Sequence, residues 1–134
     1  MKKMDVDKIK GSWNSVLRTC KAWLSIGRKI FDPSIYDNYA IRCACRKGNI
    51  ECVRMLLKDK RVDPLSEMNY PLKMSVILGN IDIVKILLDD HRLLNGLENV
   101  HIESTLANVN GYPAISDYLK WWDVYRKYKK FLLF

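Results

Sequence analysis

Two runs of apolar residues in the middle of the chain have the spacing of one face of a helix. In each run the apolar residues lie three and four positions apart, with charged residues between them. Residues at that spacing share a face of an α-helix, so each run predicts a short helix with one buried side. The runs are Ile50, Val53, Leu56 and Leu57, and Ile81, Val84, Leu87 and Leu88.

A shorter helix is predicted ahead of each run. A Gly-Asn pair separates it from the run that follows, at Gly48-Asn49 and at Gly79-Asn80. Glycine suits a helix end because the backbone turns left-handed there, and asparagine tolerates similar angles. The pattern therefore predicts two helix-turn-helix units. The inward-facing residues of the first helices are Ile41, Ala44 and Cys45, and Leu72, Ser75 and Val76.

The two units are copies of one pattern that recurs after 31 residues. The segment from Asp32-Pro33 to Asn38-Tyr39 returns as Asp63-Pro64 to Asn69-Tyr70. Proline fixes a backbone angle, and Asp and Asn bond to nearby backbone, so these segments predict turns. Stacked helical repeats form a solenoid. The predicted fold is all-α, with repeats at residues 32–62 and 63–93 of a single domain that spans 1–134.

The two ends of the chain differ from the repeats, as the terminal units of a solenoid must. Residues 1–31 predict an N-terminal cap helix. Residues 94–134 predict a degenerate third repeat, in which Pro113 interrupts the turn, followed by a long C-terminal cap helix. The apolar stripe of the cap helix at the N-terminus is Val6, Ile9, Trp13, Val16, Leu17, Cys20 and Leu24, and that of the last helix is Ile115, Tyr118, Leu119, Trp122, Tyr125 and Lys129.

Aromatic residues are concentrated in these end helices, which contain all four tryptophans. Trp13 and Trp122 lie on the apolar stripes, so we expect them in the core, whereas Trp23 and Trp121 lie beside the stripes and suit contact with a partner. The final residues, Phe131 to Phe134, are either the end of the C-terminal seal or an exposed hook, and burial is the expectation.

These motifs resemble those of the ankyrin-repeat family. The family pattern Thr-Pro-Leu-His-x-Ala, then Gly-His, Val and Leu-Leu, is matched by Tyr70-Pro71-Leu72-Lys73-Met74-Ser75, Gly79-Asn80, Val84 and Leu87-Leu88. The chain departs from it in Tyr for Thr, in Lys or Arg for His, and in the shorter period. The spelling Val-Asp-Pro…Asn-Tyr is similar to ankyrin repeats of large DNA viruses of amoebae.

The resemblance implies a non-catalytic protein-protein interaction module, with a host factor as partner if the protein is viral. It implies a concave surface made of turn tips and the exposed face of each first helix; the alternative is that these positions are simply solvated. Met74, Ile77 and Leu78 are more apolar than a solvated face requires. The implied surface residues are Tyr36, Asp37, Arg42, Cys43, Arg46, Lys47, Glu67, Met68, Lys73, Met74, Ile77 and Leu78.

Charge adds a second hypothesis. The net charge is +8, and residues 1–30 contain eight Lys or Arg against two Asp. A basic N-terminal helix could bind nucleic acid or an anionic membrane surface, and the first of these is the alternative function. The charges are spread around the predicted helix rather than gathered on one stripe, so a solvated cap face is the preferred interpretation.

The sequence contains no residue pattern typical of catalysis or cofactor binding. There is no Gly-rich phosphate loop and no Ser or Cys with a suitably spaced His. Cys20, Cys43, Cys45 and Cys52 lack the spacing of a zinc site and are interpreted as reduced core thiols. No apolar run is long enough to span a bilayer. We expect an intracellular, cytoplasmic protein without metal or cofactor, monomeric by default, with self-association through the Trp-rich ends as the open alternative.

Overall fold

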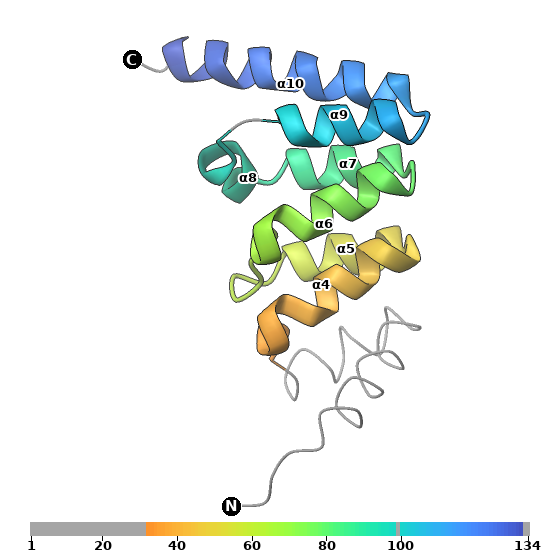
Figure 1. Cartoon of the computed structure of the whole chain (residues 1–134). Helices are drawn as coiled ribbons and strands as arrows, with labels where there is room; N and C mark the ends of the chain where they lie inside the picture. The colour runs from red at the N-terminus through yellow and green to blue at the C-terminus, as the bar shows by residue number, and fades with distance from the viewer. Residues whose placement is uncertain (1–31, 99, 133–134) are drawn as a thin grey trace, which may run out of the picture.

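The helices stack in a single pile with α4 at one end and α10 at the other (Figure 1). The computed structural model describes residues 32–98 and 100–132, and every regular element in those ranges is an α-helix. The predicted N-terminal cap helix, with Trp13, Trp23 and Cys20, lies outside the described residues. The helices are α4 (Ile35–Lys47), α5 (Ile50–Leu57), α6 (Ser66–Ile77), α7 (Ile81–Leu88), α8 (His91–Gly96), α9 (His101–Val109) and α10 (Pro113–Leu132).

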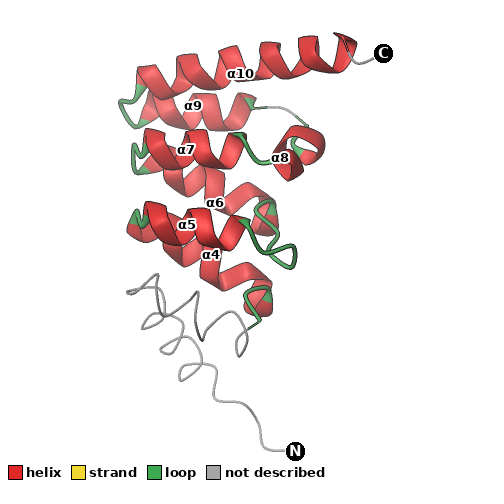
Figure 2. Cartoon of the chain, turned by 180° about the vertical axis from the view of Figure 1, so that it is seen from behind, coloured by secondary structure: helices red, strands yellow, loops and turns green. Residues whose placement is uncertain are grey.

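The pile has two layers. The first helix of each pair packs on the first helix of the next, so that α4, α6 and α9 form one layer. The second helices α5, α7 and α10 form the other, which faces the viewer in Figure 2. The all-α solenoid predicted from the repeat is confirmed. The short helix α8, inserted between the second and third pairs, was not predicted, and the division at residues 32, 63 and 94 stays a prediction.

The core lies between the layers and is built from the predicted stripes. Leu56 and Leu87 have no exposed surface, and the helices that carry them, α5 and α7, lie side by side. Full burial of a leucine side chain contributes roughly 2 kcal/mol. Ser75 is a polar member of the predicted stripes, and its hydroxyl donates to the carbonyl of Pro71 at 2.7 Å, which removes the penalty of burying it. The predicted buried residues Ile41, Ala44, Cys45, Leu72 and Val76 are all in this core.

The Gly-Asn pairs perform two tasks at each hairpin turn. Gly79 has a φ of +73°, and the amide of Asn80 returns to the carbonyl of Ser75 at 2.9 Å, which closes α6. The Asn80 side chain then accepts from the amide of Ile83 at 3.2 Å and caps the start of α7. Gly48 and Asn49 do the same between α4 and α5. One dipeptide thus ends one helix and begins the next.

The third turn replaces this asparagine with Tyr112, whose ring lies against Gly79 of the neighbouring turn. A Cβ at Gly79 would overlap that ring, whereas a Cβ at Gly111, where φ is +83°, would meet nothing within 4 Å. We expect Gly111→Ala to lower the free energy of unfolding by about 1 kcal/mol through backbone strain alone. Gly79→Ala should cost about 1 kcal/mol more, because Tyr112 must also move. Urea denaturation of both variants measures the difference, and equal losses would contradict the packing described.

Each first helix of the two good repeats begins with a left-handed turn. Tyr36, Asp37 and Asn38 have φ between 52° and 59°, and the equivalent residues of α6, Glu67 to Asn69, have φ between 52° and 64°. Left-handed residues other than glycine cost roughly 1–2 kcal/mol each, so this turn needs support. Asn38 supplies some of it, since its side-chain carbonyl accepts from the amide of Asp63 at 2.7 Å and so ties the first repeat to the second.

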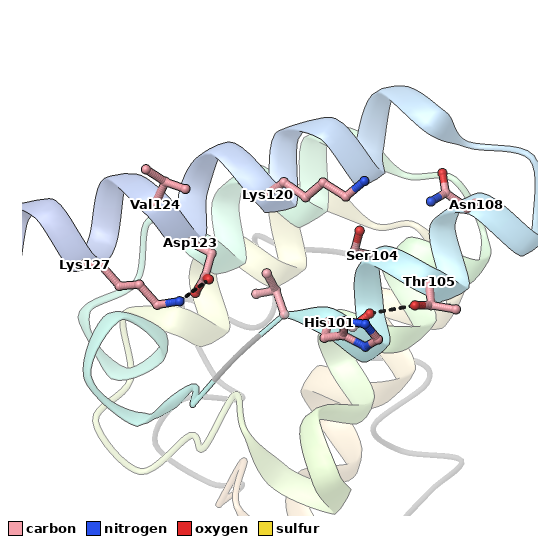
Figure 3. Close-up of a pocket in the computed structure, with 9 residues that line it drawn as sticks. His101, Ser104, Thr105, Asn108, Lys120, Asp123, Val124 and Lys127 are labelled. Atoms are coloured by element: carbon pink, nitrogen blue, oxygen red, sulfur yellow. Dashed lines mark hydrogen bonds and ion pairs between the residues drawn. The ribbon is translucent and has the colours of Figure 1, made fainter.

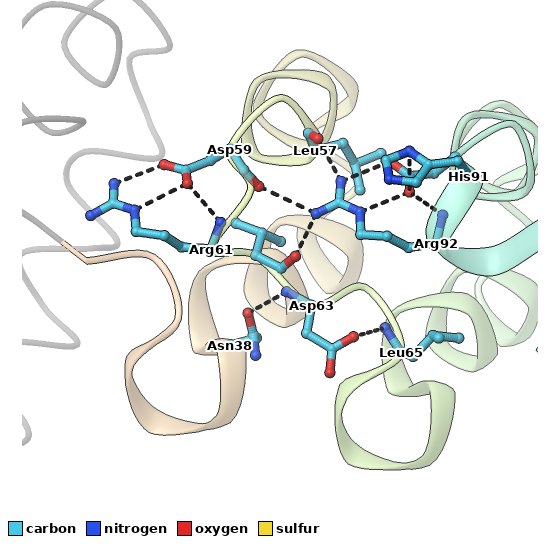
Figure 4. A network of polar contacts seen from close by, with 10 residues as sticks. Asn38, Leu57, Asp59, Arg61, Asp63, Leu65, His91 and Arg92 are labelled. Carbon is cyan, nitrogen blue, oxygen red and sulfur yellow. Dashed lines mark hydrogen bonds and ion pairs between the residues drawn. The ribbon is translucent and has the colours of Figure 1, made fainter. Parts of the chain in front are cut away.

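The loops opposite the hairpin turns are held by Arg92 (Figure 4). Its guanidinium donates to the carbonyls of Leu57 at 2.5 Å, Val62 at 2.5 Å and Asp59 at 3.2 Å, and it forms an ion pair with Asp90 at 2.8 Å. Asp59 and Arg61, one period earlier, form the same pair at 2.8 Å. Burial opposes the charge of Asp90, but the bonds from Arg92 outweigh it and lower the pKa of that carboxyl.

The C-terminal helix departs from its prediction in three ways. Pro113 does not interrupt the turn but is the first residue of α10, where its missing amide hydrogen is no loss. After Trp122 the buried stripe continues through Arg126, which donates to the carbonyls of Leu97 and Glu98, rather than through Tyr125 and Lys129, which are exposed. The expected burial of the tail is wrong for Phe131 and Leu132, which are exposed because α10 runs past the helices beneath it.

Candidate partner-binding surface

The layer formed by α4, α6 and α9 exposes apolar side chains in its second and third helices. Met68 is 82% exposed at the tip of the left-handed turn, and Leu78 is exposed at the end of α6. Between them, Met74 and Ile77 are half-buried. We call this surface, with the residues of α9 described next, the first-helix face. Four of the six positions predicted in the second repeat therefore form an accessible apolar row.

Helix α9 extends this row, which the sequence analysis did not anticipate. Ile102 is exposed, and Val109 is 77% exposed. Gly111 follows Val109 at the same distance as Gly79 follows Ile77, so the two residues occupy equivalent places on adjacent first helices. The position of Val109 relative to Gly111 could have identified it from the sequence. It was hard to recognise because Gly111 lies 32 residues after Gly79, one more than the 31-residue period.

The first repeat gives the same face a polar end. Asp37, Arg46 and Lys47 are exposed, and Tyr36 is half-buried. The prediction for Cys43 is wrong, because its side chain is buried under its neighbours, with the Arg46 guanidinium nitrogen 3.9 Å from its sulfur. The face therefore changes from charged at α4 to apolar at α6 and α9.

Arg42 is occupied within the fold. Its guanidinium donates to the carbonyls of Asp37 at 2.9 Å and Tyr36 at 2.8 Å. It also lies over the rings of Tyr39 and Tyr70, 5.9 Å and 5.6 Å from their centroids. Such contacts are typical of a guanidinium held by aromatic faces, and here they brace the left-handed turn.

Beside the apolar row, a hollow of about 310 Å³ opens between the left-handed turn of α6 and the start of α9. The predicted residues Lys73 and Met68 line it, together with carboxylates that the sequence analysis did not single out. Glu67, the remaining predicted position, is exposed on the same turn. The lining residues are Met68, Asn69, Lys73, Gly96, Glu98, Ile102 and Glu103.

A second hollow, of about 520 Å³, lies between α9 and α10 (Figure 3). Its polar groups are largely engaged with one another: Lys127 pairs with Asp123 at 2.8 Å, and the Thr105 hydroxyl donates to the carbonyl of His101 at 2.9 Å. Close by, Trp121 is 56% exposed and stacks on Tyr125 at 5.3 Å. This end of the pile therefore also presents aromatic surface.

A family model for ankyrin repeats, in three copies, matches residues 12–98. The chain belongs to the ankyrin-repeat family. The match includes residues 12–31, so the family pattern begins within the segment predicted as an N-terminal cap. No curated protein and no solved structure matches the chain.

Ankyrin repeats are generally protein-protein interaction modules, and the family is typically non-catalytic. No helix in the described ranges combines the length and the apolar character needed to cross a membrane. No group of three or more potential metal ligands occurs among residues 32–98 and 100–132. Burial raises the pKa of the Cys45 thiol to about 12, which suits a core side chain rather than a nucleophile.

Proposed function

We propose that this ankyrin-repeat protein binds a protein partner through the first-helix face, with Met74, Ile77 and Leu78 at its centre. The observation that carries the proposal is the apolar row that α6 and α9 leave uncovered. Apolar side chains in contiguous exposed rows mark interaction sites, and methionine adapts to irregular partners. The polar end at Asp37, Arg46 and Lys47 supplies a charged rim, which fixes orientation more than affinity.

Two substitutions test this proposal. Ile77→Glu and Met74→Glu place a charge in the centre of the row, and we expect each to weaken binding of a captured partner by about 30-fold, the effect of losing a hot-spot residue. Val124→Glu adds the same charge to the exposed side of α10 and should leave affinity unchanged. The measurement is capture from lysate with the wild-type chain, identification of the partner, and titration of that purified partner against the three variants. A partner whose affinity is unchanged by both Ile77→Glu and Met74→Glu contradicts the proposal.

The nucleic-acid alternative depends on residues 1–30, which lie outside the described residues. Phosphate contacts release counterions, so affinity for nucleic acid falls steeply as salt rises, whereas an apolar site responds weakly. Capture repeated with nuclease and at two salt concentrations therefore separates the two functions. Retention in both conditions supports the first-helix face.

The exposed aromatic side of α10 favours self-association as the other candidate. Trp121 and Tyr128 would be covered in such a dimer. Light scattering over a range of protein concentrations detects it, and a constant monomer mass would contradict self-association.

We propose that the protein acts inside the cell, in the cytoplasm, and in a host cell if it is viral.

A further inference from the structure

The first repeat shows how the left-handed turn of this fold holds a guanidinium. The carbonyls of Tyr36 and Asp37 point at Arg42, which reaches them from one turn further along α4 at 2.8 Å and 2.9 Å. Both carbonyls belong to left-handed residues, so the backbone conformation itself places two acceptors side by side. A planar guanidinium, with its fork of N–H donors, matches such a pair of acceptors.

The second repeat keeps the turn but lacks the guanidinium. Glu67 and Met68 have φ of 52° and 56°, close to the value of 52° that both Tyr36 and Asp37 have in the first repeat. The residue that corresponds to Arg42 is Lys73. Within residues 32–98 and 100–132, no side chain donates to the carbonyls of Glu67 and Met68, and Lys73 forms no ion pair. The hollow of about 310 Å³ lies at this turn.

A buried carboxylate lines the same hollow. Glu103, in the first turn of α9, is only 2% exposed, yet no hydrogen bond or ion pair joins its side chain to any described residue. A carboxylate that has little contact with solvent and no bonding partner among the described residues favours a cationic group that can donate to it. Glu98, which is exposed, adds a second carboxylate to the wall. The hollow therefore has two carboxylates in its wall and lies beside the left-handed turn of α6.

We propose that this hollow is an arginine cradle, which binds an arginine side chain of the protein partner. The guanidinium donates to the carbonyls of Glu67 and Met68, as Arg42 does to their counterparts, and pairs with Glu103. The acidic wall excludes a phosphate or carboxylate ligand. The inference rests on the proposed function, since the cradle adjoins the apolar row at Met68 and Ile102 and gives that face a specific anchor.

Lys73 is the side chain with which an incoming arginine competes for the cradle. Its side chain lines the cradle and carries the charge that an incoming arginine must tolerate. Lys73→Ala should therefore tighten arginine binding. Lys73→Arg places a guanidinium at the position that Arg42 holds in the first repeat, with Tyr70 at the position of Tyr39, and should fill the cradle from within. That variant should be folded, at least as stable as the wild type, and unable to bind arginine.

The experiment is an NMR titration of the full chain with N-acetyl-arginine methylamide at millimolar concentration. The matching citrulline compound has the same shape without the charge. We expect saturable shifts of the amides from Glu67 to Asn69 and at Glu103 with arginine only. Glu103→Gln, which is nearly isosteric, should weaken binding about tenfold, the effect of losing one charge-assisted hydrogen bond. Equal shifts with citrulline, or undiminished binding by folded Lys73→Arg, would overturn the cradle.

The affinity of the captured partner for two variants distinguishes a failure of the arginine cradle from a failure of the first-helix face. A partner weakened by Ile77→Glu and also by Glu103→Gln supports both. A partner weakened by Ile77→Glu but indifferent to Glu103→Gln overturns the cradle and leaves the first-helix face standing. Indifference to Ile77→Glu overturns the face, while the arginine titration still decides the cradle.

Discussion

Replacing Trp122 with alanine is expected to lower the free energy of unfolding by about 4 kcal/mol. The indole is 2% exposed, its N–H donates to the carbonyl of Leu88 at 3.1 Å, and the Arg126 guanidinium lies 4.9 Å from the ring centroid. Its removal leaves a cavity under α10 and an unpaired carbonyl at the end of α7. Because α10 closes this end of the pile, its loosening should expose α7 and α9 together.

Trp121 provides the matched control. It is the neighbouring residue on the same helix, but its side chain is 56% exposed. We expect Trp121→Ala to cost about 0.5 kcal/mol, mostly through loss of the stacking on Tyr125. Urea denaturation followed by circular dichroism measures both. Similar losses in the two variants would mean that α10 is not docked through Trp122.

Arg92→Ala should cost about 3 kcal/mol, although the residue lies in a loop region. The substitution leaves the carbonyls of Leu57 and Val62 without their donor and Asp90 without its ion-pair partner. Arg92→Lys should recover little, because an ammonium cannot reach three carbonyls and a carboxylate at once. Arg54→Ala, on the exposed side of α5, is the control, and a loss there as large as at Arg92 would contradict the assignment.

The same network predicts a pH dependence. Asp90 has a pKa below its ordinary value, so its ion pair contributes fully above the unfolded pKa, which is near 4, and the contribution is lost as pH falls through the folded pKa. The stability difference between the wild type and Asp90→Asn should therefore be largest near pH 6 and shrink below about pH 4. A difference that is constant with pH would indicate that the charge of Asp90 does not matter.

Periodicity was sufficient to predict the stacked helices, because apolar spacing reports directly which side of a helix is buried. The stripes ending in Leu56 and Leu87 lie where the sequence places them. Helix α8 was missed because it has only one fully buried residue, Leu93, and so no periodic signal. The continuation of the α10 stripe was misplaced because Arg126, a charged residue, takes an interior position through its bonds to backbone carbonyls.

The candidate site was predicted less completely than the fold. The apolar positions of α6 were recognised because Met74 and Ile77 are unusual on a solvated face. The left-handed turns were not, since Tyr, Asp, Glu and Met rarely adopt positive φ, and only Asn38 and Asn69 hinted at it. The Asp-Arg ion pairs around Arg92 correspond to a repeated Asp-x-Arg pattern, Asp59-Lys60-Arg61 and Asp90-His91-Arg92. The backbone carbonyls that Arg92 contacts depend on tertiary structure and cannot be read from that pattern. Burial of Glu103 likewise follows only from packing.

Cys43, Cys45 and Cys52 are buried in the helical core and take no part in a disulfide within the described ranges. A buried sulfur meets neither alkylating reagents nor oxidants while the helices stay packed. Modification of these three thiols is therefore conditional on opening of the interior. The rate at which an alkylating reagent modifies them in the native protein therefore measures how often the interior opens.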